Sequence, residues 1–169
     1  MIDSGTIAAI ATPIGEGGIG VIRISGDEAA VIAQRIFRKP SGSSIDLTTT
    51  DSHTLHYGKI VEGQRVIDDV LLAWMKGPHT YTRQDTVEIS CHGGPMPLRE
   101  VLRVTLAAGA RAAERGEFTL RAFLNGRLDL TQAEAVLNVI GAQTSESLRL
   151  AVNDLAGDRM SNQRANDQA

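Results

Sequence analysis

The sequence predicts an α+β domain, or mixed α/β domain, over residues 1–118, followed by a linker and the start of a helical domain over residues 119–169. Three observations support this prediction: short runs of β-branched residues bounded by turn signals, amphipathic helical stretches between those runs, and a sustained helical stripe near the carboxyl terminus. With 169 residues, the chain is long enough to bury a core without disulfides or metals.

The first elements should be two strands and a helix. Residues 6–12 and 19–25 are rich in β-branched residues and flank the turn-prone sequence PIGEGG. Ser25 and Glu28 have the spacing of a capping box, and the residues after them place apolar side chains on one helical face. That face comprises Ala29, Ile32, Ala33 and Ile36. Residues 39–51 are polar and contain Pro and Gly, so we expect a surface loop there.

The middle of the chain predicts a hairpin, a strand and a second helix. Residues 54–61 and 66–75 are expected to pair around a turn at residues 62–64, and residues 86–91 form a further strand. The second helix should run from about residue 97 to residue 108. Its inward face comprises Leu98, Val101, Leu102 and Leu106, and Gly109 is the expected C-terminal stop.

After a predicted strand at residues 111–114, the pattern becomes helical. Thr131 and Glu134 have capping-box spacing, and an apolar stripe then continues almost to the terminus. About 30 helical residues would form a rod of ~45 Å, with Gly141 as a candidate interruption. The stripe comprises Ala133, Val136, Leu137, Ile140, Leu148, Ala151, Val152 and Leu155. Such a stripe needs an apolar surface to contact: a second copy, a missing continuation of the chain, or the first domain itself.

Composition excludes several classes of protein. The 17 Lys and Arg residues against 20 Asp and Glu residues argue against nucleic-acid binding through net charge alone, although a local basic patch stays possible. The single cysteine, Cys91, excludes a disulfide framework. No apolar run approaches the ~20 residues of a membrane span. Residues 1–6 lack the features of a signal peptide, so we expect a cytoplasmic location and no membrane contact.

Two glycine-containing motifs do not indicate nucleotide binding. Residues 15–20 satisfy G-x-G-x-x-G, but residues 21–25 then read as a strand, whereas a dinucleotide site requires a helix there. The one Gly-Lys pair, Gly58-Lys59, is followed by Ile60. The chain therefore has no P-loop, and we expect no GTP hydrolysis from it.

Cys91 and His92 are neighbours where a strand leads into a helix. Adjacent strand residues point to opposite faces, so the two side chains are poorly placed to share a proton, and a buried thiol is the better interpretation. His53, His56 and His79 show no metal-ligand spacing with them. We therefore predict neither a catalytic residue nor a metal ligand.

Four charged residues stand in unusual positions. Arg23 and Glu88 each interrupt an apolar strand segment, VIRIS and TVEIS, where a charge is either paired or simply on the solvent face. Arg121 and Arg127 flank the Asn125-Gly126 turn signal. This positively charged hinge either binds a carboxylate or solvates a turn.

Three blocks of this sequence resemble the MnmE (TrmE) family of tRNA-modification GTPases. The blocks are ATPIGEGGIGVIRISG at residues 11–26, the GP-x-TYT and D-x-VEISCHGG series at residues 77–94, and GEFTLRAFLNGRLDLTQAEAV at residues 116–136. The resemblance implies a folate-binding N-terminal domain similar in fold to the tetrahydrofolate-binding aminomethyltransferases. It also implies that this domain forms a homodimer and precedes the first long helix of an α-helical domain. GTP, Mg and K would belong to a GTPase domain that this chain lacks.

The resemblance also implies a function. With an FAD-dependent partner protein, the family installs an aminomethyl or carboxymethylaminomethyl group at C5 of the wobble uridine of certain tRNAs. The implied cofactor is 5-formyltetrahydrofolate or 5,10-methylenetetrahydrofolate. By motif position, the folate-binding residues are Arg23, Glu88 and Arg127. A carboxylate suits the donor edge of a 2-aminopterin, and guanidinium groups suit glutamyl carboxylates and ring carbonyls.

The chain departs from the family pattern at three places. Arg127 replaces the usual lysine, Arg115 replaces the usual proline before GEF, and Arg83-Gln84 replaces the usual Gly-Glu after TYT. Two alternative functions stay open: a structural dimerisation domain with a degenerate folate pocket, and a stand-alone folate-dependent one-carbon transferase. The transferase would require a general acid or base, and none stands at a suitable spacing.

Overall fold

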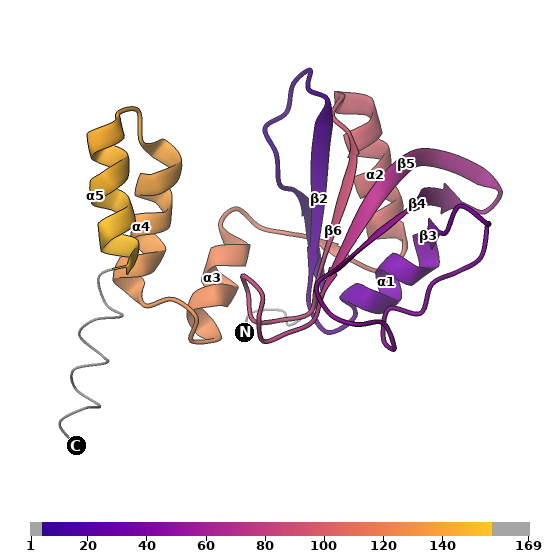
Figure 1. Ribbon diagram of the computed structural model, residues 1–169, viewed down its shortest axis with the longest axis horizontal. Coiled ribbons are helices and arrows are strands. Elements are labelled where there is room, and N and C mark those ends of the chain that lie inside the picture. Colours follow the sequence, from indigo (N-terminus) through magenta and orange to yellow (C-terminus); the bar gives the residue numbers. More distant parts are fainter. Residues whose placement is uncertain (1–4, 157–169) are drawn as a thin grey trace. The chain divides into compact units, whose positions relative to one another are not determined.

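The computed structural model describes residues 5–156. The chain divides into two compact units, Met1–Phe118 and Thr119–Ala169. The first unit is a seven-stranded sheet with helices α1 (Ala29–Ile36) and α2 (Pro95–Ala107), and the second unit is helical (Figure 1). The chain is therefore a mixed α/β protein, as the sequence predicts.

The sheet brings distant parts of the sequence together. Its strand order is β3-β4-β5-β6-β2-β1-β7, and neighbours are antiparallel except for the parallel pair β1 and β7. The strands are β1 (Ile7–Ile10), β2 (Ile19–Ser25), β3 (Phe37–Arg38), β4 (Thr54–Glu62), β5 (Arg65–Met75), β6 (Thr86–His92) and β7 (Arg111–Ala112). The pairing of β2 with β6 places the VIRIS and TVEIS segments side by side in the middle of the sheet.

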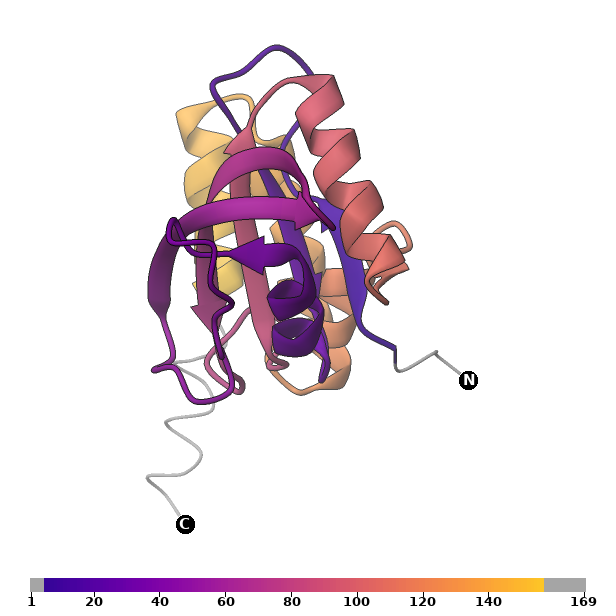
Figure 2. The same ribbon diagram turned by 90° about the vertical axis from the view of Figure 1, so that its right-hand side faces the viewer.

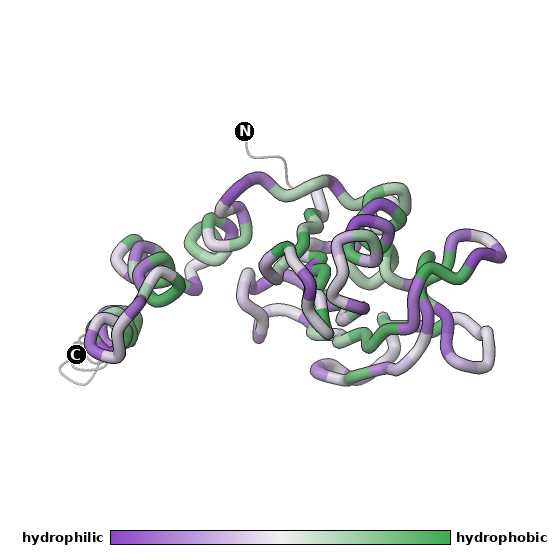
Figure 3. Tube along the Cα trace, turned by 90° about the horizontal axis from the view of Figure 1, so that it is seen from above, coloured by the Kyte–Doolittle hydropathy of each residue, from purple (hydrophilic) through white to green (hydrophobic). Residues whose placement is uncertain are grey.

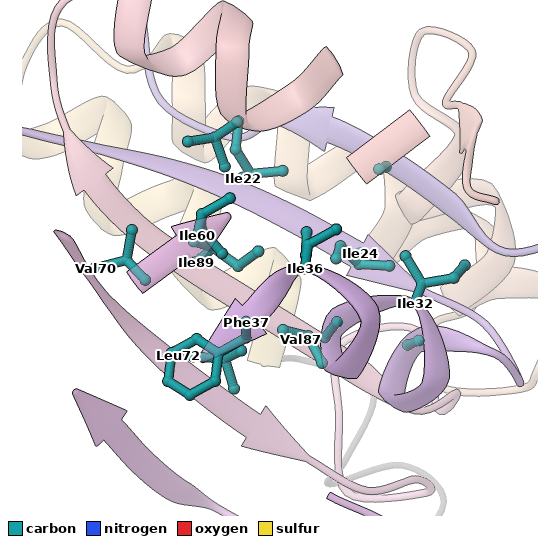
Figure 4. Packing of buried hydrophobic residues seen from close by; sticks show 14 of the residues in the cluster. Ile22, Ile24, Ile32, Ile36, Phe37, Ile60, Val70, Leu72, Val87 and Ile89 are labelled. Carbon is teal, nitrogen blue, oxygen red and sulfur yellow. The ribbon is translucent and has the colours of Figure 1, made fainter. Parts of the chain in front are cut away.

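Helices α1 and α2 cover one face of this sheet (Figure 2). Because strand side chains alternate between faces, every second residue of β2 and β6 enters the core, as Figure 4 shows for Ile22, Ile24, Val87 and Ile89. Each such fully buried side chain contributes about 1.5–3 kcal/mol relative to an exposed one. The intervening residues, including Arg23 and Glu88, point to the other side, which we call the second face of the sheet.

Most predicted elements of the first unit are confirmed, but the start of α1 is not. The helix begins at Ala29 with Glu28 as its N-cap, and no side chain provides a capping hydrogen bond. Ser25 instead shares a 2.6 Å hydrogen bond with Thr82, 57 residues further along the chain. The predicted capping box of Ser25 and Glu28 is therefore wrong, because a long-range partner occupies the hydroxyl group.

The second unit contains α3 (Glu117–Leu124, which begins at the end of the first unit), α4 (Leu130–Gly141) and α5 (Ser145–Ala156). The candidate interruption at Gly141 is confirmed: the helical stripe forms two helices instead of one rod of ~45 Å, because the chain turns after Gly141 and α5 packs back against α4. Thr144 and Ser147 begin α5 through reciprocal bonds: each hydroxyl oxygen accepts from the other residue's backbone N–H. Residues 157–169 of the expected helical domain lie outside the described residues.

The capping box of α4 lies two residues before its predicted position. Asp129 accepts a 2.7 Å hydrogen bond from the backbone N–H of Gln132, whose side chain accepts one from the Asp129 backbone. The prediction of Thr131 and Glu134 was therefore wrong in register but right in kind.

Apolar and polar residues alternate along the helices of the second unit (Figure 3). Several large apolar side chains stay exposed there, including Leu137 at 70% and Ile140 at 77%. Among residues 5–156, no helix combines the length and apolar composition that crossing a membrane requires.

Candidate functional site

Arg23 and Glu88 meet on the second face of the sheet. They are directly opposite each other across β2 and β6, 65 residues apart in sequence. The Nε and Nη2 atoms of Arg23 each lie 2.7 Å from Oε1 of Glu88, and both side chains are 30% exposed. The two charges that interrupt the apolar strands are therefore an ion pair at the surface, where a ligand can reach them.

The pair leaves one carboxylate oxygen available. Both contacts from Arg23 go to Oε1, and within residues 5–156 no group donates a hydrogen bond to Oε2 of Glu88. An ionised carboxylate has about four acceptor positions. Oε2 can therefore accept N–H donors from a bound molecule, and such charge-assisted bonds are about twice as strong as neutral ones.

Two aromatic rings flank the guanidinium group of Arg23. Its central carbon lies 5.8 Å from the ring centre of Tyr81 and 5.7 Å from that of Phe118. Both distances are within the range of a cation–π interaction. We call Arg23, Tyr81, Glu88 and Phe118 the Arg23 cluster. Only six residues of the chain are aromatic, one Trp, two Tyr and three Phe, so two on one guanidinium is a notable concentration.

The loop between β5 and β6 positions Tyr81. Next to Tyr81, Thr82 is buried and its hydroxyl oxygen lies 2.6 Å from that of Ser25 on β2. A hydrogen bond within the loop also holds its two sides together: the Thr80 hydroxyl donates to the Gln84 carbonyl at 2.6 Å. These contacts attach the loop to the edge of the second face.

An ion pair between the buried Glu117 and the partly exposed Arg111 positions Phe118. Glu117, which is 4% exposed, accepts from Nη2 of Arg111 on β7 at 2.6 Å and from Nη1 at 3.1 Å. It also accepts a 2.8 Å bond from the backbone N–H of Glu114. This bidentate contact fixes the segment immediately before Phe118 to the sheet.

The third predicted site residue, Arg127, belongs to the second unit. It is exposed and follows the Asn125-Gly126 turn, where Gly126 has a φ of 71°. Its backbone N–H donates to the Ala122 carbonyl at 2.9 Å. The turn signal is thus confirmed, whereas a role of Arg127 in folate binding stays a prediction.

Cys91 and His92 lie on opposite faces of β6, as alternation predicts. Cys91 is 4% exposed within the core, and burial, together with the nearby charge of Asp68, raises its pKa to about 11. A thiol in this environment is a poor nucleophile. Within the described part of the chain, no group of three or more His, Cys, Asp or Glu residues is arranged to hold a metal ion.

His92 instead pairs with Asp68 of β5. Its Nδ1 lies 2.6 Å from Oδ1 of Asp68, and its backbone N–H donates to Oδ2 at 2.9 Å. The hydrogen bond that the His92 ring donates to the Asp68 carboxylate raises the pKa of His92 above its usual 6.5. No local sequence signal could have identified this pair, because the two residues are 24 positions apart.

The departures from the family pattern have different structural settings. Arg83 has a φ of 62°, in the left-handed region that favours glycine, which accounts for the usual glycine at this position. Oε1 of Gln84 accepts a weak 3.4 Å bond from Ser25. Nothing in the structure explains Arg115.

Sequence reasoning missed Tyr81 and Phe118 as site residues. Both stand inside quoted blocks, TYT and GEF, but neither an aromatic residue in a loop, such as Tyr81, nor one at the start of a helix, such as Phe118, carries a local sign of its long-range contact. They were identifiable only from the three-dimensional contacts of the Arg23 guanidinium group.

Comparisons with known proteins identify the family of this chain. Residues 6–127 match the family model described as the GTP-binding protein TrmE N-terminus. The chain is 54% identical over 154 residues to the tRNA modification GTPase MnmE of Lysinibacillus sphaericus, covering 90% of this chain and 33% of the relative. It is 50% identical over 154 residues to MnmE of Bacillus subtilis, with the same coverage, and 54% identical over 159 residues to that of Acetivibrio thermocellus, covering 93% and 34%. The chain thus spans about one third of the length of these relatives, and it belongs to the MnmE/TrmE family, as its N-terminal domain.

Proposed function

We propose that this chain is a tetrahydrofolate-binding module, with the Arg23 cluster as the binding site for the pterin ring. The observation that carries the proposal is the geometry of the Arg23–Glu88 pair. It leaves Oε2 of Glu88 accessible and without a hydrogen bond from residues 5–156. A carboxylate oxygen of this kind fits the adjacent N–H and amino donors of a 2-aminopterin.

The residues of the Arg23 cluster, together with Arg127, would bind and orient the cofactor. Glu88 would accept from the donor edge of the pterin, and Arg127 would pair with a carbonyl or a glutamyl carboxylate. The cofactor, 5-formyltetrahydrofolate or 5,10-methylenetetrahydrofolate, supplies a one-carbon unit when bound. We assign Arg23, Glu88 and Arg127 to binding and no residue of this chain to catalysis.

The relatives carry the name tRNA modification GTPase, and we propose that this module serves the same process. In that process an aminomethyl or carboxymethylaminomethyl group is added at C5 of the wobble uridine, together with an FAD-dependent partner protein. The module would hold the one-carbon donor in place for chemistry completed by other parts of the assembly.

We further propose that the module forms a homodimer. Leu55, Tyr57 and Leu71 lie on the second face of β4 and β5 and are 63%, 58% and 42% exposed, and we call them the β4–β5 patch. Beside the patch, Lys59 lies 4.0 Å from Asp69, so both signs of charge are present. A two-fold contact brings the same surface of each copy together, and such a surface can complement itself.

Thermal unfolding with and without 5-formyltetrahydrofolate tests the proposal. A ligand that binds only the native state at a hundredfold excess over Kd adds about 2.7 kcal/mol to the free energy of unfolding. At roughly 2–4 °C per kcal/mol for a chain of this size, we expect Tm to rise by about 5–10 °C. An unchanged Tm at saturation would favour the structural dimerisation alternative, and turnover of folate by the chain would favour the transferase alternative.

A substitution at Glu88 tests whether this residue binds the folate. Hydrogen bonds to a charged group contribute about 1.5–3 kcal/mol, so Glu88→Gln should weaken folate binding by roughly 10- to 150-fold in calorimetric titration. Glu134→Gln, at an exposed position on α4, is the matched control and should leave the affinity unchanged. Equal affinities of wild type and Glu88→Gln would remove Glu88 from the site.

A further inference from the structure

We propose that Tyr81 and Phe118 are positioning residues: their rings hold Arg23 on one oxygen of Glu88 and thereby keep the other oxygen available to the ligand. The proposal deepens the proposed folate site and rests on it.

The geometry of the ion pair is the first step of the argument. Arginine and carboxylate groups frequently form a fork in which two N–H groups meet two oxygens. Here Nε and Nη2 of Arg23 both approach Oε1 of Glu88. A fork would occupy both oxygens with Arg23, whereas the observed arrangement leaves Oε2 for an incoming donor.

The second step is what keeps Arg23 in this arrangement. An ion pair that is 30% exposed is weakly held on its own, because water competes and a long side chain has many rotamers. The rings of Tyr81 and Phe118, at 5.8 and 5.7 Å, restrict the guanidinium group and lower its exposure to water. The rings therefore supply the constraint that the ion pair lacks.

The third step is that each ring is itself fixed by contacts outside the cluster. Tyr81 precedes Thr82, whose hydroxyl group meets that of Ser25 in the interior. Phe118 follows Glu117, which is held by Arg111 in a bidentate pair. Two independent anchors, on β2 and on β7, thus bring two aromatic rings to one guanidinium. The constraint on Arg23 exists before any ligand binds.

A ligand-free measurement tests the constraint directly. The Nε–H signal of Arg23 in a nitrogen–proton NMR spectrum, assigned by its loss in Arg23→Lys, should be shifted by the ring currents and should exchange slowly with water. In Phe118→Leu and Tyr81→Leu this signal should move toward the position of free arginine and exchange faster. The aromatic variants Phe118→Tyr and Tyr81→Phe should retain it. Phe123→Leu, at a residue that is 38% exposed on α3, is the control.

A double-mutant cycle with 5-formyltetrahydrofolate tests the consequence for binding. Loss of one ring should weaken affinity about threefold to tenfold, with an unchanged melting temperature of the free protein. In an Arg23→Ala background, Phe118→Leu should cause no further loss, because the ring acts through Arg23. An equal loss in both backgrounds would overturn the proposal and make the ring a direct ligand contact.

The two levels of the proposal fail differently. If the wild-type chain does not bind the folate, the proposed function fails, while the Arg23 signal still decides whether the rings restrain the guanidinium. If the Nε–H signal of Arg23 is identical in wild type and both leucine variants, the positioning role of Tyr81 and Phe118 fails even when folate binds. Should Phe118→Leu not fold, Tyr81→Leu carries the same comparison through the other anchor.

Discussion

Alternation along β6 controls the reactivity of the one cysteine. Cys91 faces the core, and its raised pKa of about 11 leaves only about one thiol in a thousand ionised at pH 8. We predict that an aromatic disulfide reagent modifies native protein at least about a hundredfold more slowly than protein unfolded in guanidinium chloride. The reaction is followed by absorbance. Rapid stoichiometric labelling of the folded chain would contradict the buried position of this thiol.

The sequence identified individual site residues but not the residues that they contact. Arg23 and Glu88 were recognisable as charges within apolar strands, because alternation and hydropathy are local properties of the sequence. That they pair with each other depends on the adjacency of β2 and β6, which no local pattern encodes. For the same reason Tyr81 and Phe118 could not be connected with Arg23.

At the scale of elements, local patterns predicted most strands and α2 correctly. The hairpin of β4 and β5 and the strand β6 follow from β-branched runs and turn residues close in sequence. The predictions of helix starts failed where a side chain forms a hydrogen bond with a residue distant in sequence, or where two local sequence patterns disagree. Ser25 contacts Thr82 and does not cap α1. The apolar stripe near the carboxyl end continues across the break at residues 142–144, where Gly141 was the candidate interruption and Thr144 and Ser147 carry a start signal for α5.

The contact between β5 and β6 through Asp68 and His92 should depend on pH. The pKa of His92 is raised in the folded state, mainly by its hydrogen bond to Asp68, so the folded state binds the proton more tightly than the unfolded state. The stabilisation is fully present below the usual pKa of about 6.5 and is lost as pH rises through the higher folded value. The difference in free energy of unfolding between wild type and His92→Gln should therefore be larger near pH 5.5 than near pH 9, as measured by urea denaturation.

A second histidine gives a control of opposite sign. Burial, assisted by the charge of Lys39, lowers the pKa of His56, so protonation disfavours its folded state. The stability of wild type relative to His56→Gln should fall as pH decreases through the usual value of about 6.5. If both variants followed the same pH trend, the assignment of the effect to the Asp68–His92 contact would be wrong.

At the scale of the whole molecule, each unit keeps an apolar surface exposed. The first unit has the β4–β5 patch of Leu55, Tyr57 and Leu71. The second has exposed leucine and isoleucine side chains on α4 and α5, and Leu137 and Leu150 also line a groove between these helices. Because the surfaces belong to different units, substitutions can test them separately.

The homodimer proposal predicts which of these surfaces mediates self-association. The double variant Leu55→Lys and Leu71→Lys places unpaired charges in the β4–β5 patch, and burial of such charges is costly. We expect its dimer dissociation constant in sedimentation velocity to rise at least about tenfold, with an unchanged far-ultraviolet circular dichroism spectrum. Leu137→Lys, at a residue of the other unit that is 70% exposed, should leave the dissociation constant unaltered. The opposite result would place the interface on α4 and α5, and a monomeric wild-type chain would exclude the dimer, because neither surface would then recognise its own copy.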